Sequence, residues 1–133
     1  MTSSAKRSRM FAGVTMTLLS GFALGEGPAD AARGQRLFMQ CSVCHSLPAT
    51  PGMLGPPLRG IVGQKAGAAP GYPYSSALAA AGLQWDEATL NRWLERPTDL
   101  VPGTKMIFAG IANPADRAAV IAYLKSTTIP PKR

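Results

Sequence analysis

The sequence predicts a small all-α protein of three or four helices joined by long loops. Three segments combine apolar residues at helical spacing with residues that cap or end helices. Residues 46–73 contain six prolines and six glycines, which disfavours regular structure there. The chain has no run of strand-forming residues from which a sheet could be built. Its 133 residues are suited to one domain.

The N-terminus has the three-part pattern of a secretory signal peptide. A polar start with three basic residues is followed by an uncharged, mostly apolar run over residues 10–24 and then by small residues. This pattern predicts a leader over residues 1–25 and a mature domain over 26–133, with cleavage after Ala31 as the second choice. The apolar run is shorter than the roughly 20 residues that a membrane span needs. We therefore expect export, and no stable membrane insertion after cleavage.

The net charge does not indicate a nucleic-acid partner. The whole chain carries 14 basic and 7 acidic residues. Three of the basic residues lie in the predicted leader, which leaves 11 basic against 7 acidic residues and a net charge of +4. The mature chain has no basic run interleaved with aromatic residues, so we expect no nucleic-acid binding. Nothing in the pattern indicates an oligomer interface, and we expect a monomer.

The first helix of the mature chain is predicted over residues 30–40, with Asp30 as its N-cap. Its apolar face is formed by Gly34, Leu37 and Phe38. After the proline- and glycine-rich region, residues 74–81 are expected to form a short helix.

A third helix is predicted over residues 86–95. Asp86 is suited to cap its start, and Pro97 ends it. Its apolar face consists of Leu90, Trp93 and Leu94.

The last helix has the clearest signals in the sequence. Asn113 is the expected N-cap, Pro114 takes the first helical position and Asp116 lies in the first turn. The apolar positions that follow are Val120, Ile121 and Leu124, with Tyr123 beside them. Pro130 and Pro131 are expected to close the helix.

So few helices provide only a thin core. A mature chain of 108 residues with this much loop would be marginally stable unless something else filled its centre. A loop as long as residues 46–73 is unusual in a compact domain unless it is functional or wraps another group. A large apolar cofactor would meet both requirements.

The segment CSVCH at residues 41–45 contains both cysteines and the only histidine of the chain. A zinc site is one interpretation, but it needs four ligands, and the adjacent Cys44 and His45 are hard to direct at one tetrahedral ion. A thiol redox pair is a second interpretation, but its expected βαβ context is missing. A covalently held haem fits every feature. Cys41 and Cys44 can each form a thioether to a porphyrin vinyl group, and His45 can bind the iron from the same side.

The iron then needs a sixth ligand or keeps an open position. Because no second histidine exists, methionine is the remaining candidate. Met39 lies too close to Cys41 to reach the opposite face of the haem, and Met53 lies only eight residues after His45. Met106, in the turn sequence PGTKM, lies 61 positions after His45 and is the leading candidate. A methionine that only fills the core is the alternative.

These motifs together resemble the class I cytochromes c, of the mitochondrial type and its bacterial short-chain relatives. The resemblance covers residues 34–125. It runs through GQRLFMQCSVCH, GPPLRGIVGQKAG, APGYPYSSAL, LQW, RWLERP, VPGTKMIFAGI and DRAAVIAYLK. It implies a small cytochrome c fold, in which three to five helices and long loops surround one covalently attached haem c with its iron.

The resemblance implies a role for particular residues of this chain. It implies thioethers at Cys41 and Cys44, His45 and Met106 as the iron ligands, and Pro56 as the acceptor of the His45 ring N–H.

The resemblance assigns further residues to the haem pocket. Tyr74 and Trp85 would donate to a buried propionate, Thr104 would help to hold it, and Phe108 would flank the haem on the methionine side. At the crossing of the first and last helices, Gly34 and Phe38 would meet Val120 and Tyr123.

The chain also departs from the family pattern. Gln64 replaces an arginine that pairs with a propionate, Leu78 replaces an asparagine, and Trp93 replaces a tyrosine near the ligand sulfur. The expected effects on the reduction potential oppose each other, because a lost positive charge lowers it and a drier pocket raises it.

The expected partner surface departs from the family pattern too. The lysines around the haem edge of mitochondrial relatives are replaced by Gln40, Thr98, Asp99, Ala112 and Asn113, while Lys65 and Lys105 remain. We expect a docking surface with an apolar centre, near Leu47, Met53 and Leu54.

The resemblance implies a periplasmic one-electron carrier, not an enzyme. It would shuttle electrons between a dehydrogenase or quinol-oxidising complex and a terminal oxidase or reductase. The alternatives are a dedicated electron-transfer subunit of one dehydrogenase, and a haem peroxidase or gas sensor with a labile distal ligand.

Overall fold

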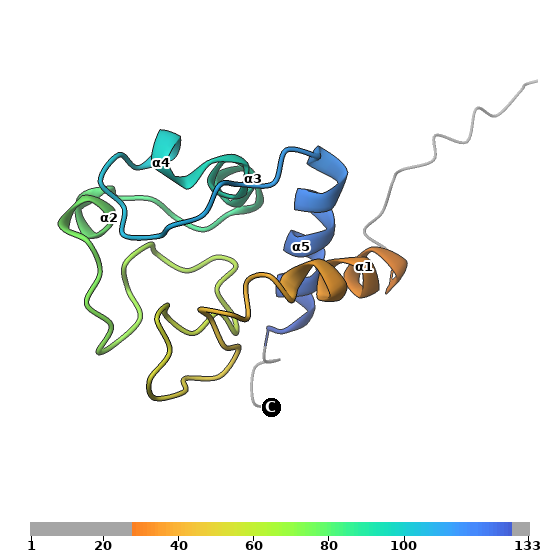
Figure 1. Cartoon of the computed structure of the whole chain (residues 1–133), viewed down its shortest axis with the longest axis horizontal. Helices are drawn as coiled ribbons and strands as arrows, with labels where there is room; N and C mark the ends of the chain where they lie inside the picture. The colour runs from red at the N-terminus through yellow and green to blue at the C-terminus, as the bar shows by residue number, and fades with distance from the viewer. Residues whose placement is uncertain (1–27, 129–133) are drawn as a thin grey trace, which may run out of the picture.

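The computed structural model describes residues 28–128, which fold into five helices and long loops (Figure 1). The helices are α1 (Pro28–Phe38), α2 (Ser76–Ala80), α3 (Glu87–Glu95), α4 (Pro97–Leu100) and α5 (Pro114–Ser126). The prediction of an all-α fold is confirmed. In this part of the chain, an isolated bridge between Lys65 and Gln84 stands in place of a sheet. None of the described helices is both long and apolar enough to cross a membrane. The predicted leader and the closing prolines 130 and 131 lie outside the described residues.

Helix α1 begins two residues earlier than predicted. Asp30 was expected at the N-cap, and this expectation is wrong, because Asp30 lies in the first turn of the helix. A carboxylate in the first turn still interacts favourably with the positive end of the helix dipole. The second-choice cleavage position, after Ala31, lies inside α1.

The predicted start of α3 is confirmed by its cap. The carboxylate of Asp86 accepts a hydrogen bond from the Thr89 backbone N–H at 2.7 Å. Helix α2 is shorter than predicted and has its own cap, because the hydroxyl oxygen of buried Ser75 accepts from the Leu78 N–H at 3.1 Å. Both helices thus begin at a side chain that satisfies a backbone donor without an intrahelical partner.

The chain turns into a further short helix after α3. Pro97 follows the end of α3 as predicted, but it also occupies the first position of α4, which the sequence analysis did not predict. The fixed φ of proline suits this position. A backbone N–H here would have no acceptor within the helix, so its absence in proline costs no helical hydrogen bond.

Helix α5 starts as predicted and crosses α1 (Figure 1). The Asn113 side chain accepts from the Ala115 N–H at 2.9 Å, and Pro114 takes the first helical position. At the crossing, a Cβ on Gly34 would overlap the Ala119 carbonyl group and the Tyr123 side chain. The backbone of α1 therefore lies directly against α5 at Ala119 and Tyr123, and Phe38 and Val120 belong to the same core cluster.

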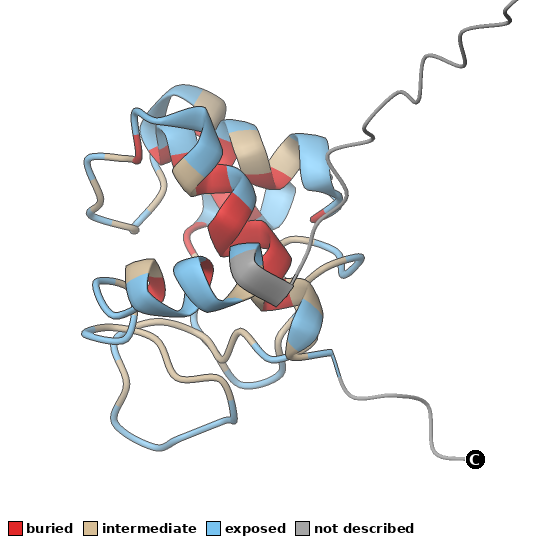
Figure 2. Ribbon diagram, turned by 90° about the vertical axis from the view of Figure 1, so that its right-hand side faces the viewer, coloured by how far each residue is buried: buried red, intermediate tan, exposed pale blue. Residues whose placement is uncertain are grey.

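Aromatic contacts continue this crossing and the core behind it. The Phe38 and Tyr123 rings lie 5.3 Å apart, as the resemblance implied. Trp85 and Trp93 pack with ring centroids 5.2 Å apart. The buried residues are concentrated in α5 and the helices against it, whereas no residue of the loop 46–73 is fully buried (Figure 2). The core is as thin as predicted on the loop side.

The far end of this loop is held by a short antiparallel pairing. The Gly63 N–H donates to the Trp85 carbonyl at 2.8 Å, and the Trp85 N–H donates to the Gln64 carbonyl at 2.8 Å. The Ala66 N–H donates to the Leu83 carbonyl at 2.9 Å. These bonds fix the position of Trp85 before α3 begins.

Candidate haem site

The segment that contains both cysteines continues directly from α1 in tight turns. The Cys41 N–H donates to the Phe38 carbonyl at 2.8 Å, and the N–H groups of Cys44 and His45 donate to the Cys41 carbonyl at 3.1 and 2.9 Å. The cysteines are therefore about one helical turn apart, and both are half-buried free thiols. This is the spacing that two thioethers to one porphyrin require.

The geometry does not favour the two other interpretations of this segment. Burial raises the pKa of the Cys41 thiol, which is the opposite of the lowered pKa that activates a redox cysteine. Over residues 28–128, no three side chains of His, Cys, Asp or Glu gather closely enough to hold a metal ion. Cys41, Cys44 and His45 thus do not form a zinc site by themselves.

The imidazole of His45 is oriented by one hydrogen bond. Its Nδ1 lies 2.8 Å from the carbonyl oxygen of Pro56, which is the contact that the resemblance implies. Because a carbonyl can only accept, Nδ1 must carry the proton, and Nε2 keeps its lone pair. The ring is therefore held in the tautomer and orientation in which Nε2 can bind iron.

Gly55 forms a wall against the same ring, and the sequence analysis missed it. A Cβ at this position would overlap the Cε1 and Nδ1 atoms of the His45 ring. The Gly55 N–H also donates to the Cys44 carbonyl at 2.8 Å, which ties the loop to the cysteine segment. The glycine directly before two prolines was the available signal, because glycine allows a backbone to approach a side chain closely.

The turn before Met106 is closed by Thr104. The Thr104 N–H donates to the Val101 carbonyl at 3.1 Å, and the Thr104 hydroxyl oxygen accepts from the Met106 N–H at 3.3 Å. Met106 and Phe108 are both half-buried and pack against the core cluster.

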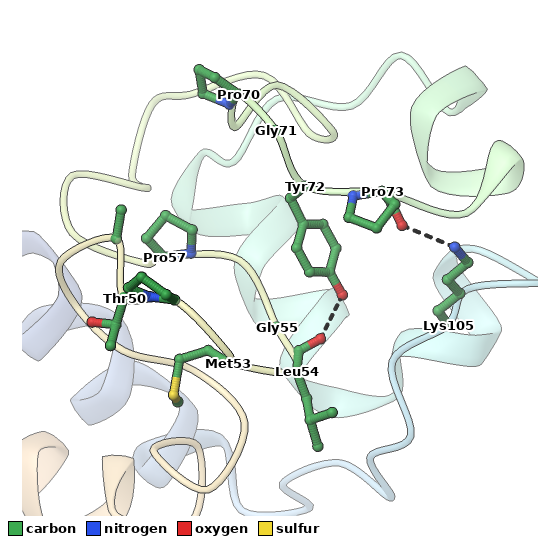
Figure 3. A pocket seen from close by; sticks show the side chains of 12 residues that line it. Thr50, Met53, Leu54, Gly55, Pro57, Pro70, Gly71, Tyr72, Pro73 and Lys105 are labelled. Carbon is green, nitrogen blue, oxygen red and sulfur yellow. Dashed lines mark hydrogen bonds between the residues drawn. The ribbon is translucent and has the colours of Figure 1, made fainter.

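The two other methionines of the described chain are placed differently. Met39 is 70% exposed on the surface. Met53 lines a cavity of about 630 Å³ between loops 49–57 and 70–73 (Figure 3). None of the residues predicted to hold the haem or its iron lines this cavity, although Gly55 and Pro57, on either side of Pro56, do. Among the three methionines, Met106 is the one that packs against the core.

Trp85 belongs to the hydrophobic core, and Tyr74 packs against it. The Tyr74 hydroxyl oxygen accepts from the Ala69 N–H at 3.3 Å, so its own hydrogen is still available for donation. Burial raises the pKa of Tyr74, and the bond from Ala69 opposes this only in part, so the phenol is neutral at pH 7. Trp85 is buried, 6% exposed, and is held by its backbone bonds to Gly63 and Gln64.

The donor set and the apolar residues around it fit a haem. His45 offers an oriented nitrogen, and half-buried apolar side chains from separate loops contact the core while keeping part of their surface uncovered. They include Leu47, Leu58, Ile61, Val62 and Leu83. A flat apolar group that covered them would add the burial that the helices alone do not provide.

The three departures from the family pattern differ in burial. Leu78 and Trp93 are 8% and 7% exposed and belong to the core, whereas Gln64 is exposed. Two of the three changes therefore make the interior less polar or larger, and the third lies at the surface.

The residues expected at the centre of an apolar docking surface differ in exposure. Leu54 is 76% exposed, whereas Leu47 and Met53 are half-buried and Leu47 packs against the core. Two further apolar side chains, Val43 and Ile107, are 76% and 102% exposed and were not expected at this surface. Val43 lies between the two cysteines, and Ile107 directly follows Met106.

Comparisons with known proteins identify the family of this chain. Residues 31–128 match the family described as Cytochrome c. The chain is 52% identical over 97 residues to cytochrome c2 of Rhodomicrobium vannielii, and the match covers 71% of this chain and 77% of that protein. It is 52% identical over 89 residues to cytochrome c2 iso-2 of Magnetospirillum fulvum, and the match covers 67% of this chain and 93% of that protein. The solved structure of cytochrome cH from Methylobacterium extorquens superposes with a TM-score of 0.70 at 48% identity, over 73% of this chain and 98% of that one.

Proposed function

Because this chain belongs to the class I cytochrome c family, we propose that it is a periplasmic one-electron carrier with a His/Met-ligated haem c. Cytochromes c are electron carriers and not enzymes, and they bind one covalent haem c with its iron. Cys41 and Cys44 have the spacing of the haem-binding motif. The bound haem supplies an iron that alternates between the ferric and ferrous states.

The orientation of His45 is the single observation that carries this proposal. The Pro56 carbonyl at 2.8 Å holds the proton on Nδ1, and the backbone of Gly55 stops the ring from tilting. A ring fixed in this way changes little between two oxidation states, which suits electron transfer rather than substrate binding.

Met106 is the proposed second iron ligand. Its half-buried position against the core and the Thr104 bond to its backbone support this assignment, whereas Met39 is largely exposed. With both axial positions filled, exogenous molecules have no free position at the iron.

Four further residues are proposed to hold the haem. Tyr74 and Trp85 would donate to a propionate, Thr104 would assist from the methionine turn, and Phe108 would flank the haem on that side. The neutral Tyr74 hydroxyl and the fixed position of Trp85 support these roles.

The cellular place of the protein is also proposed. The leader predicted over residues 1–25 and the attachment of haem c after export both favour the periplasm. The partners are then redox proteins, a dehydrogenase or quinol-oxidising complex as donor and an oxidase or reductase as acceptor. The chain acts as a monomer that meets them in turn.

The contact surface is proposed to be apolar at its centre. Leu54 and Ile107 are strongly exposed, and the loop 46–57 carries no charge. Electrostatically steered association falls steeply with ionic strength. We therefore expect the electron-transfer rate to the physiological partner to change less than tenfold between low and physiological salt, and a larger fall would contradict an apolar surface.

The test of this function begins with the intact mass of the exported protein. One covalently attached haem on a chain that lacks its leader is expected. The ferric protein should then show the near-infrared sulfur-to-iron band. Met106→Ala should abolish this band, whereas the control Met53→Ala, at the surface cavity, should keep it. A band that persists in Met106→Ala would show that another residue is the ligand.

The same spectrum separates the carrier from a haem peroxidase or gas sensor. A carrier with a closed coordination sphere binds exogenous ligands poorly, whereas a labile distal site takes them up readily. Stable co-purification with one dehydrogenase would instead identify a dedicated subunit.

A further inference from the structure

Tyr72 connects two loops that lie far apart in the sequence. Its hydroxyl donates to the backbone carbonyl of Leu54 at 2.7 Å, 18 residues earlier (Figure 3). Leu54 directly precedes Gly55 and Pro56, which form the wall and the hydrogen-bond acceptor for His45. The Tyr72 hydroxyl therefore holds the loop that orients the proposed histidine ligand.

The residue after Tyr72 makes the corresponding connection on the other side. The Pro73 carbonyl accepts a hydrogen bond from the Lys105 ammonium group at 2.9 Å, across 32 residues (Figure 3). Lys105 directly precedes Met106. Two consecutive residues thus connect the histidine loop to the methionine turn.

Local contacts stiffen this connecting segment. The Tyr72 ring packs edge-on against Tyr74 with centroids 4.8 Å apart, and the Tyr74 N–H donates to the Tyr72 carbonyl at 3.0 Å. The loops on either side lack helices and contain many prolines and glycines. Segments of this kind open locally at low free energy unless specific contacts hold them.

We propose that Tyr72 is a positioning residue which, through Pro73 and Lys105, couples the histidine loop to the methionine turn and keeps Met106 on the iron. This inference rests on the proposed His45/Met106 ligation. The segment 72–73 and its two hydrogen bonds act in series, so loss of either bond separates the two loops.

The binding of an added ligand measures this coupling. Imidazole can bind the ferric iron only in the fraction of molecules in which Met106 has moved away. The apparent dissociation constant is therefore the intrinsic constant divided by the open fraction. A residue that stabilises the closed state lowers the open fraction and weakens imidazole binding.

The first experiment uses Tyr72→Phe, which removes the hydroxyl and keeps the ring. Loss of a typical hydrogen bond should raise the open fraction about fivefold, so imidazole should bind the ferric holoprotein about five times more tightly. Tyr123→Phe is the control, because Tyr123 lies at the α1–α5 crossing against Phe38. Its imidazole affinity should equal that of the wild type.

The second experiment tests whether the two bonds act in series. Lys105→Ala should tighten imidazole binding by a similar factor, with the exposed Lys65→Ala as its control. The double variant Tyr72→Phe/Lys105→Ala should bind imidazole no more tightly than the stronger single variant. Effects that multiply in the double variant would show two independent loop contacts and would overturn the coupling.

The outcomes separate this inference from the proposed ligand set. An unchanged imidazole affinity in Tyr72→Phe would overturn the role of Tyr72. If the wild-type protein itself lacked the sulfur-to-iron band, the Met106 ligation would fail first. Covalent haem content and the near-infrared spectrum without imidazole establish that each variant has folded. If Tyr72→Phe fails this check, Tyr72→Leu replaces it, because leucine also lacks a side-chain donor.

Discussion

Arg117 is a buried cation that joins α5 to the chain around it. It is only 6% exposed, and its Nε donates to the Asn91 side chain at 2.8 Å. One terminal nitrogen donates to the carbonyls of Ile111 and Ala112 at 2.8 and 2.9 Å. Glu95 lies 3.9 Å from the other terminal nitrogen. We predict that Arg117→Leu strongly destabilises the holoprotein.

The expected size of the effect follows from what each partner would lose. Ala112 is exposed, so water can replace the guanidinium at its carbonyl. Ile111 is buried and Asn91 is half-buried, so their groups would be left without a partner. Each buried group that loses its hydrogen-bond partner costs about 1–3 kcal/mol of stability. Removal of the buried guanidinium charge offsets part of this cost, because the charge no longer has to be desolvated. The net loss in the free energy of unfolding should be about 2–4 kcal/mol.

Guanidinium unfolding of the oxidised holoprotein, followed by far-UV circular dichroism, measures this loss. Arg92→Leu is the matched control, because Arg92 is exposed on α3 and its replacement should change the stability by less than about 0.5 kcal/mol. A loss below about 1 kcal/mol in Arg117→Leu would refute the view that these bonds anchor α5.

Two further changes test the helix crossing and a helix cap. Gly34→Ala should lower the free energy of unfolding by about 1–3 kcal/mol although alanine is the better helix former, because its Cβ overlaps the α5 backbone; a more stable variant in a denaturant titration would contradict the close approach. The hydrogen bond from the Thr89 backbone lowers the pKa of Asp86, so this carboxylate stabilises the fold above its ordinary pKa and stops doing so as the pH falls through the lowered one. The stability difference between the wild type and Asp86→Ala should therefore be constant near pH 7 and shrink as the pH falls below about 4, and a difference that did not shrink at all in acid would contradict a role for the charged carboxylate.

The helices that could be predicted are those with local signals. Asp86 and Asn113 cap α3 and α5 as expected, because a cap is decided within three residues of its own position. Asp30 could not be placed correctly, because the helix extends beyond it to Pro28. Helix α4 was missed, because a single turn has no apolar period to detect.

The site was predictable where residue type alone restricts the chemistry. One histidine next to two cysteines, with three methionines in residues 26–133, leaves few ways to bind a metal. The role of Tyr72 was not predictable, because it depends on a contact across 18 residues that no local pattern encodes, and the glycine before two prolines was only a weak signal for the contact of Gly55 with His45, 10 residues away. Arg117 gave a weak signal, since it stands four residues before Ile121 on the apolar face of α5.

The sequence by itself determined the helical class, the haem-binding segment and the candidate ligands, because caps, periodicity and ligand chemistry act over a few residues. Only the tertiary structure decided which methionine packs against the core, how closely Gly55 approaches the His45 ring and how residues 72–73 connect the loop before Pro56 to the turn before Met106. These depend on how the long loops close on each other. Loop closure is set by contacts between residues far apart in the chain, and the sequence order of the loops does not specify them.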